Sequence, residues 1–355
     1  MPGTRGSHRV TIVDVARAAG VSRQTVSNVI NYPDRVAPAT LATVERHIAE
    51  LGFHPSRAAS LLRRETAGAW GFELDTLGTR RLGNILDSFV VELTARAAVT
   101  GAHIMPFVAS PSMSVTDYRD LLAGRHVDGF VIANTAHGDP RPAWLVEQGV
   151  PFAAFGRIWD DPTIERYADV DGGAGVRAAV RHLKQGGYGT IGFLGWPTGS
   201  PVGDDRRRGW LTESGGGPEA TAYQEIDSAA RVAVDLVRQV GKGGAIVCAS
   251  DVLAAGVWRH LTEIGLVAGR DIGLVGFDDT DLAETIGLTS LSQPLAAVAD
   301  HVLALLADEP VGAALLTPEL VVRTSSIPQE PQVSSFDLPR SPDPAGSDQH
   351  PGGTA

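Results

Sequence analysis

From about residue 69 onward, short apolar runs alternate with amphipathic stretches of helical period, and this alternation constrains the fold more than any other feature of the chain. Strands that alternate with helices form parallel sheets with helices on both faces. The expected strands are residues 70–74, 103–108, 129–133, 152–155, 190–194, 245–249 and 272–277, and the expected helices between them include 85–100, 173–185 and 251–264. The pattern therefore predicts an α/β body.

The segment that precedes this body has a different pattern and the opposite charge. Residues 11–51 have the pattern of three short helices. Residues 1–64 contain nine arginines against four carboxylates, a formal net charge of +5, which leaves −16 for the rest of a chain whose total is −11. A small basic head on a large acidic body is typical of a DNA-binding module joined to a domain that does not touch DNA.

Cysteine usage and the apolar runs exclude several classes of protein. Cys248 is the only cysteine and lies in an apolar run that predicts a buried strand, so a disulfide framework or a cysteine-based metal site within one chain is excluded. No apolar run is long enough to span a bilayer, and the polar residues 1–10 lack the apolar stretch of a secretory signal. We expect a cytoplasmic protein with no membrane contact, no metal and no cofactor.

Residues 11–31 have the layout of a helix-turn-helix. Thr11 is expected to cap the first helix, with Asp14 three residues on to complete a start that resembles a capping box. Gly20 supplies the tight turn, where a positive φ is needed, and Ser22 caps the second helix. An ordinary solvated helix face is the alternative, but capping, turn and basic surroundings agree on a unit that reads DNA.

The second helix carries side chains suited to base reading. Arg23, Gln24, Ser27 and Asn28 share the face opposite its apolar side chains, where a major groove would meet them. Gln24 and Asn28 can each form paired hydrogen bonds with an adenine edge, and Arg23 can bind a guanine or a phosphate. With the flanking positions, the predicted DNA contacts of the head are Thr11, Ser22, Arg23, Gln24, Thr25, Ser27, Asn28, Asn31 and Arg35.

A third helix is expected at residues 38–51, with Gly52 as its stop, and a short segment of alanines, leucines and arginines follows. Together, residues 10–64 resemble the head of the lac-repressor (LacI/GalR) family. In that family the segment after the third helix is a hinge that becomes helical on operator DNA.

The resemblance assigns roles to three residues of this hinge. Leu62 matches by position the leucine that each subunit wedges into the minor groove, which bends the duplex. Ala59 matches the small residue that lets two hinges approach closely, and Arg57 completes the predicted DNA contacts. A merely flexible linker is the alternative for the unbound state.

The resemblance continues to about residue 325. Its landmarks are residues 125–132, 155–157, 169–175, 203–210, 249–251 and 276–279. It implies a body like a periplasmic sugar-binding protein: two doubly wound parallel-sheet subdomains, crossed by three strands, with the ligand in the cleft between them. In open α/β sheets ligands bind where strands end, and several of these landmarks lie there.

The predicted effector contacts follow apolar strands or open helices. Charged planar groups grip vicinal hydroxyls with paired hydrogen bonds, and aromatic faces cover the apolar side of a sugar ring. By resemblance, Arg206 matches the arginine that grips the effector, and Asp278 matches the aspartate after the last core strand. The full set is Phe155, Arg157, Asp171, Trp196, Arg206, Ser250, Asp251 and Asp278.

Each of these residues also has a plainer interpretation as a surface ion pair or a satisfied loop carboxylate. That interpretation is preferred for Arg207 and Arg208, because runs of arginine are usually solvated. Asp251 could simply cap its helix.

Four positions depart from the family's pattern. Asn28 stands where many members carry arginine, so the bases read there are expected to differ from the usual ones. Ala37 replaces the usual hydroxyl cap of the third helix, which should lower helix stability. Ser250 and Gly172 stand where asparagine is frequent, and their shorter side chains could leave room for a larger sugar.

The chain thus divides into five predicted parts. Residues 1–9 form a flexible N-terminus, 10–54 the helix-turn-helix domain, and 55–64 the hinge. Residues 65–325 form the domain for effector binding and dimerisation. Residues 326–355, rich in Pro, Gly, Ser and Asp, are expected to be a disordered tail.

The function predicted from these features is that of a sequence-specific transcriptional regulator, a repressor of carbohydrate-utilisation genes controlled by a small sugar. One recognition helix reads too few bases, so a homodimer should bind a nearly palindromic operator in double-stranded DNA. The alternative is a sugar-binding protein without a regulatory role, which would need an export signal where this chain has a basic head. An enzyme is not expected, because no Ser-His-Asp set, metal spacing or phosphate loop stands out.

Overall fold

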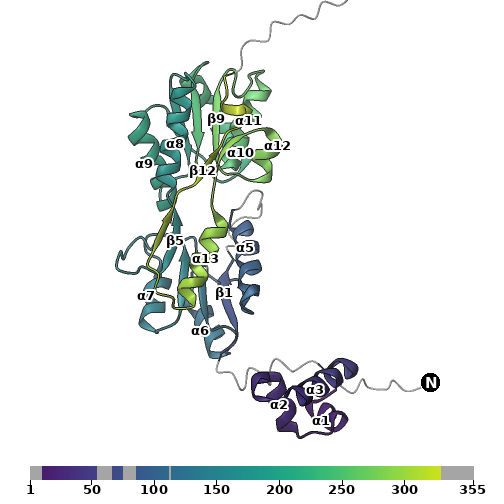
Figure 1. Ribbon diagram of the computed structural model, residues 1–355. Helices are drawn as coiled ribbons and strands as arrows, with labels where there is room; N and C mark the ends of the chain where they lie inside the picture. Colours follow the sequence, from purple (N-terminus) through teal and green to yellow (C-terminus); the bar gives the residue numbers. More distant parts are fainter. Residues whose placement is uncertain (1–9, 54–65, 75–84, 112, 329–355) are drawn as a thin grey trace, which may run out of the picture.

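Two six-stranded sheets organise the body of the chain, one in each of two subdomains (Figure 1). The computed structural model describes residues 10–53, 66–74, 85–111 and 113–328. The N-terminal sheet has the strand order β11-β5-β4-β3-β1-β2, and the C-terminal sheet has the order β12-β10-β9-β8-β6-β7. Neighbouring strands run parallel, except that β12 is antiparallel to β10.

All seven expected strands are present, with bounds within one residue of those predicted. The strands are β1 (Ala69–Glu73), β2 (His103–Phe107), β3 (Gly129–Ala133), β4 (Phe152–Phe155), β5 (Tyr167–Val170), β6 (Ile191–Gly195), β7 (Glu219–Thr221), β8 (Ala245–Cys248), β9 (Gly273–Asp278), β10 (Thr289–Ser292), β11 (Ala314–Leu316) and β12 (Glu319–Val321). The sequence did not predict β5, β7, β10, β11 and β12. These strands have only three or four residues each, and four of the five contain a charged or hydroxyl side chain, which interrupts the kind of apolar run that marked the equally short β4 and β8.

The three helices that the sequence predicted for the body are present as α5, α8 and α11. The helices are α1 (Ile12–Ala19), α2 (Arg23–Asn31), α3 (Pro38–Leu51), α5 (Ile85–Val99), α6 (Val115–Ala123), α7 (Pro140–Glu147), α8 (Gly172–Gln185), α9 (Pro201–Ser214), α10 (Ile226–Val240), α11 (Asp251–Glu263), α12 (Asp281–Ile286) and α13 (Leu295–Leu306), with 3-10 turns at Pro33–Arg35 and Thr324–Ser326.

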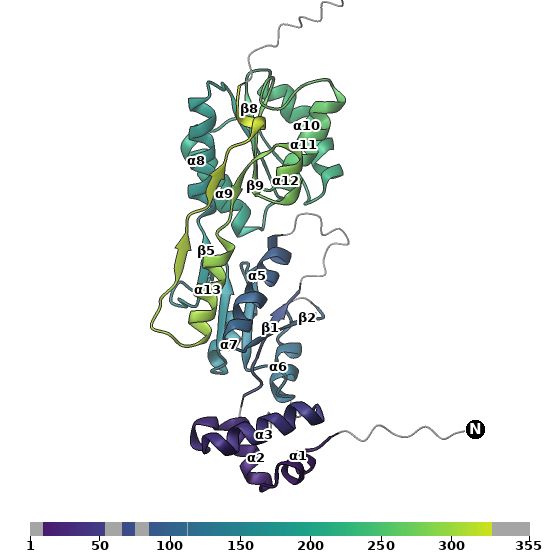
Figure 2. The ribbon, with the colours of Figure 1, turned by 45° about the vertical axis from the view of Figure 1, so that its right-hand side comes forward.

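Helices cover both faces of each sheet, which confirms the predicted doubly wound α/β class (Figures 1 and 2). In the N-terminal subdomain α5 packs beside α13, and Phe89 and Val302 are fully buried between these helices and the sheet. Residues of α6 and α7, among them Tyr118 and Leu145, form a second core on the other face. In the C-terminal subdomain α8 packs beside α9, and α10 packs beside α11.

Three connections join the subdomains, as the resemblance implied. The chain leaves the N-terminal sheet after β5, returns between β10 and α13, and crosses again between β11 and β12. The carboxyl ends of β4 and β5 therefore lie at the same junction as those of β6, β8 and β9. Residues that follow these strands can reach one another across that junction.

The head is a separate group of three helices around the buried side chains of Val15, Val26 and Val44 (Figure 1). Ala37 gives no side-chain cap to α3, as predicted. Gly52 ends α3 with φ 61°, a left-handed conformation that glycine adopts without a steric penalty.

Cys248 is fully buried at the end of β8, which confirms its predicted place in a core strand. Ser326 is also buried, and its hydroxyl lies 2.7 Å from that of Thr289. The predicted start of the tail at residue 326 is therefore too early; most of the predicted tail, residues 329–355, lies outside the described residues. Among the residues that are described, no helix is both long and apolar enough to cross a membrane.

Candidate functional site

The helix-turn-helix forms as the sequence predicted. The backbone N–H of Thr11 donates to the Asp14 carboxylate at 2.9 Å and its hydroxyl does so at 2.6 Å. Gly20 turns the chain with φ 68°. Ser22 then caps α2, because its hydroxyl accepts a hydrogen bond from the Thr25 backbone N–H at 3.0 Å. The caps and the turn fix the angle between α1 and α2, so they set the direction in which α2 presents its outer face.

The outer face of α2 exposes Arg23 and Gln24 and leaves Asn28 half-buried. The side-chain amide of Gln24 donates to the Asn28 carbonyl oxygen at 3.1 Å, which holds the two side chains together along one face of the helix. Such a pair presents amide donors and acceptors to a groove, and Arg23 adds a charge beside them. Arg35 is exposed, with its guanidinium 5.0 Å from the centre of the Tyr32 ring.

Ser27 does not belong to this face. Only 7% of its surface is exposed, so the prediction that it faces DNA is wrong in this structure. The reason is that α2 packs against both α1 and α3, so its buried arc is wider than the apolar positions alone suggested. Thr25 is half-buried, with its hydroxyl 2.8 Å from that of Ser22. The side chain of Asn31 and the hinge residues Arg57, Ala59 and Leu62 lie outside the described part of the chain.

In the body, Arg206 projects from α9 into the junction between the subdomains. It is only 5% exposed, and its guanidinium lies 3.5 Å from the centre of the Phe277 ring and 5.3 Å from that of Trp196. Its Nη1 donates to the carbonyl oxygen of Ala249 at 2.5 Å. Its Nε is buried and has no hydrogen-bond partner among the described residues. Burial lowers the pKa of Arg206, because the charged form loses hydration.

Asp278, the last residue of β9, lies opposite this arginine. Its Oδ1 is 3.8 Å from Arg206 Nη2, too far for a hydrogen bond, and it accepts one from the Gln293 amide at 2.7 Å. Burial raises the pKa of Asp278 to about 7, although the attraction of Arg206 opposes this rise. The carboxylate and the guanidinium thus face each other with unused hydrogen-bonding capacity on the arginine.

A hollow of about 570 Å³ opens beside Asp278 between the subdomains. The N-terminal subdomain contributes Ile85, Ser88 and Leu295, and the C-terminal side contributes residues 278–282, Thr285, Ser292 and Gln293. This volume lies in the range typical of sites for small molecules.

Arg157 joins the two subdomains. It follows β4, and its Nε donates to Asp169 of the same subdomain at 2.6 Å. Its Nη2 donates to Asp205, on α9 of the other subdomain, at 2.9 Å. The cation lies between two carboxylates, and their attraction raises the pKa of Arg157 against the effect of burial. Arg157 is therefore placed at the predicted site, where it also ties the walls of the cleft together.

Four predicted effector residues are engaged in the fold itself. Asp171 caps α8, because its carboxylate accepts the Ala174 backbone N–H at 2.7 Å. Ser250 is fully buried and caps α11. The alternative prediction that Asp251 caps this helix is therefore wrong, because Ser250 caps it. Phe155 is 8% exposed and packs on the core ring of Phe89, with 4.4 Å between centroids, so it offers no face to a sugar.

The Asp251 carboxylate instead holds two later segments of the chain. It accepts hydrogen bonds from the Ser290 hydroxyl at 2.6 Å and from the backbone N–H of Thr280 at 2.8 Å. Burial raises its pKa to about 6, although these bonds lower it. Gly172 leaves no extra room for a ligand, because a Cβ there would lie 2.9 Å from Cγ of Arg206, which already fills the space.

Several residues at the junction escaped the sequence analysis. Gln224 accepts hydrogen bonds from the Trp196 indole at 2.5 Å and from the Ser250 hydroxyl at 2.8 Å. It follows the three-residue strand β7, which has no distinctive pattern. The sequence pointed to Asp205 and Phe277 only as neighbours of Arg206 and Asp278 and assigned them no role of their own. Trp159, two residues after Arg157, lies under its guanidinium at 4.8 Å from the ring centre.

Comparisons with known families agree with both halves of the chain. Residues 11–56 match the family described as bacterial regulatory proteins, lacI family. Residues 180–326 match the periplasmic binding protein-like domain.

Individual relatives extend this agreement over nearly the whole chain. The transcriptional regulator CelR of Thermobifida fusca is 31% identical over 91% of this chain and 98% of its own. The lactose operon repressor of Escherichia coli is 32% identical over 77% of this chain and 76% of its own. The lac repressor dimer bound to operator and anti-inducer superposes with a TM-score of 0.76 at 28% identity, covering 90% of this chain and 100% of that one. This chain therefore belongs to the lacI family of bacterial regulatory proteins, and it is a DNA-binding transcriptional regulator, not an enzyme.

Proposed function

We propose that this regulator represses carbohydrate-utilisation genes and that a small sugar controls its binding to operator DNA. The names of its relatives support a sugar: CelR was solved in complex with cellobiose, with a TM-score of 0.64, and two other relatives are the lactose operon repressor and the maltose regulon regulatory protein MalI.

The observation that carries this proposal is the buried side chain of Arg206. Its Nε, which has no partner among the described residues, can donate a hydrogen bond but cannot accept one, whereas a carboxylate such as Asp278 accepts hydrogen bonds. A hydroxyl group does both, so neighbouring hydroxyls of a sugar can bind the guanidinium and the carboxylate together. The half-buried ring of Trp196 beside Arg206 adds apolar surface that suits the C–H face of a pyranose.

Calorimetric titration of the full chain with glucose, galactose, cellobiose, lactose and maltose tests the proposal. At least one sugar should bind, and Arg206→Ala should weaken its binding by roughly 10- to 100-fold, the effect of losing one charge-assisted hydrogen bond. Arg207→Ala is the matched control, because Arg207 lies outside the cleft and pairs with Glu219 at 2.7 Å. Failure of all five sugars would reject a sugar effector of these kinds, and normal binding by Arg206→Ala would reject the site.

The proposed partner of the head is a nearly palindromic operator, read by Arg23, Gln24 and Asn28 in the major groove. An operator can be selected from random duplexes with the wild-type chain. Gln24→Ala should then weaken binding to the selected duplex roughly 5- to 100-fold, but binding to a random duplex much less, because base contacts carry the specificity. The exposed Arg46 on α3 gives a control, Arg46→Ala, that should not change the ratio. An equal loss on both duplexes would contradict base reading by Gln24.

The hinge is proposed to contribute through Leu62, as the resemblance implies. Leu62→Ala should weaken binding to the selected operator strongly and binding to a random duplex little, since the phosphate contacts of the head remain. The affinity for sugar without DNA should stay the same. A uniform loss on both duplexes at several salt concentrations would rule out a wedge.

The regulator is proposed to act as a homodimer through its body. Large apolar side chains are exposed there, with Val91 and Val99 of α5 at 70% and 88% and Tyr223 at 71%. Val91 and Val99 lie on one helix, α5, and we propose this helix as part of the interface between subunits. Sedimentation equilibrium of the full chain at micromolar concentration should give twice the monomer mass of 37.2 kDa, and a strictly monomeric protein would reject the proposal.

A further inference from the structure

Asp128 lies immediately before β3, at the end of the N-terminal sheet where its parallel strands begin. The carboxyl ends of these strands face the junction between the subdomains, so Asp128 lies at the opposite end of the sheet from the proposed sugar site. The chain enters the body at the same end as Asp128, because residues 66–68 lead directly into β1.

The half-buried carboxylate of Asp128 binds the backbone of the entry segment, residues 67–69. It accepts hydrogen bonds from the backbone N–H groups of Ala67 at 2.5 Å and of Gly68 at 2.6 Å, and a longer one from that of Ala69 at 3.4 Å. Consecutive N–H groups that converge in this way form a concave site for an anion, and hydrogen bonds to a carboxylate are about twice as strong as neutral ones. One side chain therefore holds three consecutive residues of the backbone.

Gly68 allows these N–H groups to converge. Its φ is 65°, a left-handed conformation that glycine adopts without a steric penalty. Backbone hydrogen bonds hold the same segment: the Gly68 carbonyl oxygen accepts the N–H of His103 at 3.0 Å, and the Ala69 carbonyl oxygen accepts the N–H of Asp128 at 2.8 Å. The entry segment is thus attached to the start of β2 and to the start of β3.

The position of the entry segment decides where the head is joined to the body. The predicted hinge ends at residue 64, three residues before Ala67. Three released residues could extend by roughly 10 Å, since an extended chain spans about 3.3–3.6 Å per residue. Two heads that bind two half-sites at a fixed spacing are sensitive to such slack, because the tether sets the effective concentration at which the second head binds.

We propose that Asp128 fixes the point at which the hinge leaves the body, and that two heads can therefore bind both halves of an operator together. The inference rests on the proposed homodimer and its nearly palindromic operator. Asp128 does not contact DNA; it is a positioning residue that acts through the backbone of residues 67–69. Without it, these residues would have to be ordered when the operator binds, at a cost in conformational entropy.

The test compares the operator selected from random duplexes with a duplex that keeps only one half of it, at one salt concentration and with the full chain. Asp128→Asn keeps the shape of the side chain but replaces an acceptor oxygen with an N–H donor, so it cannot hold both N–H groups. Its affinity for the full operator should fall roughly tenfold or more, because the released residues must be ordered on binding. Its affinity for the half-site should change less than about twofold.

A second variant disturbs the same interaction from the side of the backbone. Gly68→Ala places a Cβ where no atom of the described residues lies within 4 Å, but it strains the left-handed backbone and should move the N–H groups away from the carboxylate. It should show the same pattern as Asp128→Asn. The double variant should lose no more affinity than the more affected single variant, because both changes break one interaction. Additive losses would contradict the proposal.

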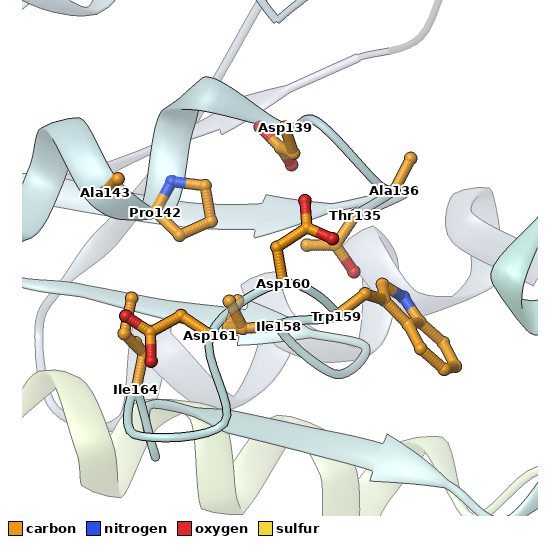
Figure 3. A pocket seen from close by; sticks show the side chains of 10 residues that line it. All are labelled: Thr135, Ala136, Asp139, Pro142, Ala143, Ile158, Trp159, Asp160, Asp161 and Ile164. Atoms are coloured by element: carbon orange, nitrogen blue, oxygen red, sulfur yellow. The ribbon is translucent and has the colours of Figure 1, made fainter.

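Asp161→Asn is the matched control, at another half-buried aspartate of the same subdomain that accepts a backbone N–H, that of Thr163 at 2.9 Å. Figure 3 shows Asp161 on the loop between β4 and β5. It should change neither affinity. Equal losses on the two duplexes, or no loss on the full operator in Asp128→Asn or Gly68→Ala, would overturn the proposal. A wild-type chain that binds the full operator no more tightly than the half-site would reject the proposed dimeric binding itself, which is a separate outcome.

Discussion

Replacing Asp278 by asparagine should make the protein more stable above neutral pH. Asp278 is 8% exposed at the end of β9, and burial raises its pKa from 3.8 to about 7. Between these values the folded state binds a proton that the unfolded state releases, so the free energy of unfolding decreases as pH rises and the decrease is complete above about pH 7. Asparagine has nearly the same shape but cannot ionise.

The size of the effect follows from the pKa. A shift of about three units, at about 1.4 kcal/mol per unit, makes the ionised carboxylate cost up to about 4 kcal/mol in the folded protein. Part of this cost is already present at pH 5, so the advantage of Asp278→Asn over wild type should grow by roughly 2–3 kcal/mol between pH 5 and pH 8. The pKa of about 7 already includes the attraction of Arg206 and the repulsion from Asp251, and both interactions are lost when a neutral asparagine replaces Asp278.

Differential scanning calorimetry of the full chain across this pH range measures the effect. The melting temperature of Asp278→Asn should exceed that of wild type at pH 8 by several degrees, and the gap should narrow at pH 5. Asp281→Asn, at an exposed aspartate of α12, is the control and should show a constant difference. A variant less stable than wild type at pH 8 would refute the reasoning, because it would show that the attraction of Arg206 outweighs the cost of burial.

Two further predictions concern local packing. Ser22→Ala removes the hydroxyl that accepts the Thr25 N–H at 3.0 Å, which should destabilise α2 by about 1 kcal/mol. Hydrogen exchange of the α2 amides should then become about fivefold faster. Unchanged exchange would show that the cap is unimportant. Gly209→Ala places a Cβ 2.4 Å from the carbonyl oxygen of Gly173, which should force α8 and α9 apart and destabilise the C-terminal subdomain by about 1–3 kcal/mol. Gly189→Ala is the control, because the nearest atom to its Cβ would be the Gly243 carbonyl oxygen at 3.9 Å, an ordinary contact distance. Thermal unfolding of both variants tests the argument, and equal melting temperatures would contradict it.

The sequence predicted where the candidate site lies better than it predicted which side chains are free to act there. Arg206 and Asp278 were identified because the predicted effector contacts follow apolar strands or open helices, and because both residues match effector contacts of the family that the chain resembles. The structure brings them within 3.8 Å of each other. Asp251 followed the same rule, yet its carboxylate binds Thr280 and Ser290, 29 and 39 residues further along the chain. Partners so distant leave no local pattern, so no reading of the residues around Asp251 could reveal them.

The amino-acid sequence by itself determined the elements of this protein whose cause is local. Short apolar runs predicted seven of the strands within one residue, and the Ser22 cap and the Gly20 turn follow from side-chain and backbone preferences over a few residues. Only the tertiary structure decided that Ser27 is buried, because this depends on α2 packing against two other helices. It also decided that Arg157 ties the subdomains together through Asp205, 48 residues away, since charge and hydrogen bonding act between whatever groups the fold brings into contact.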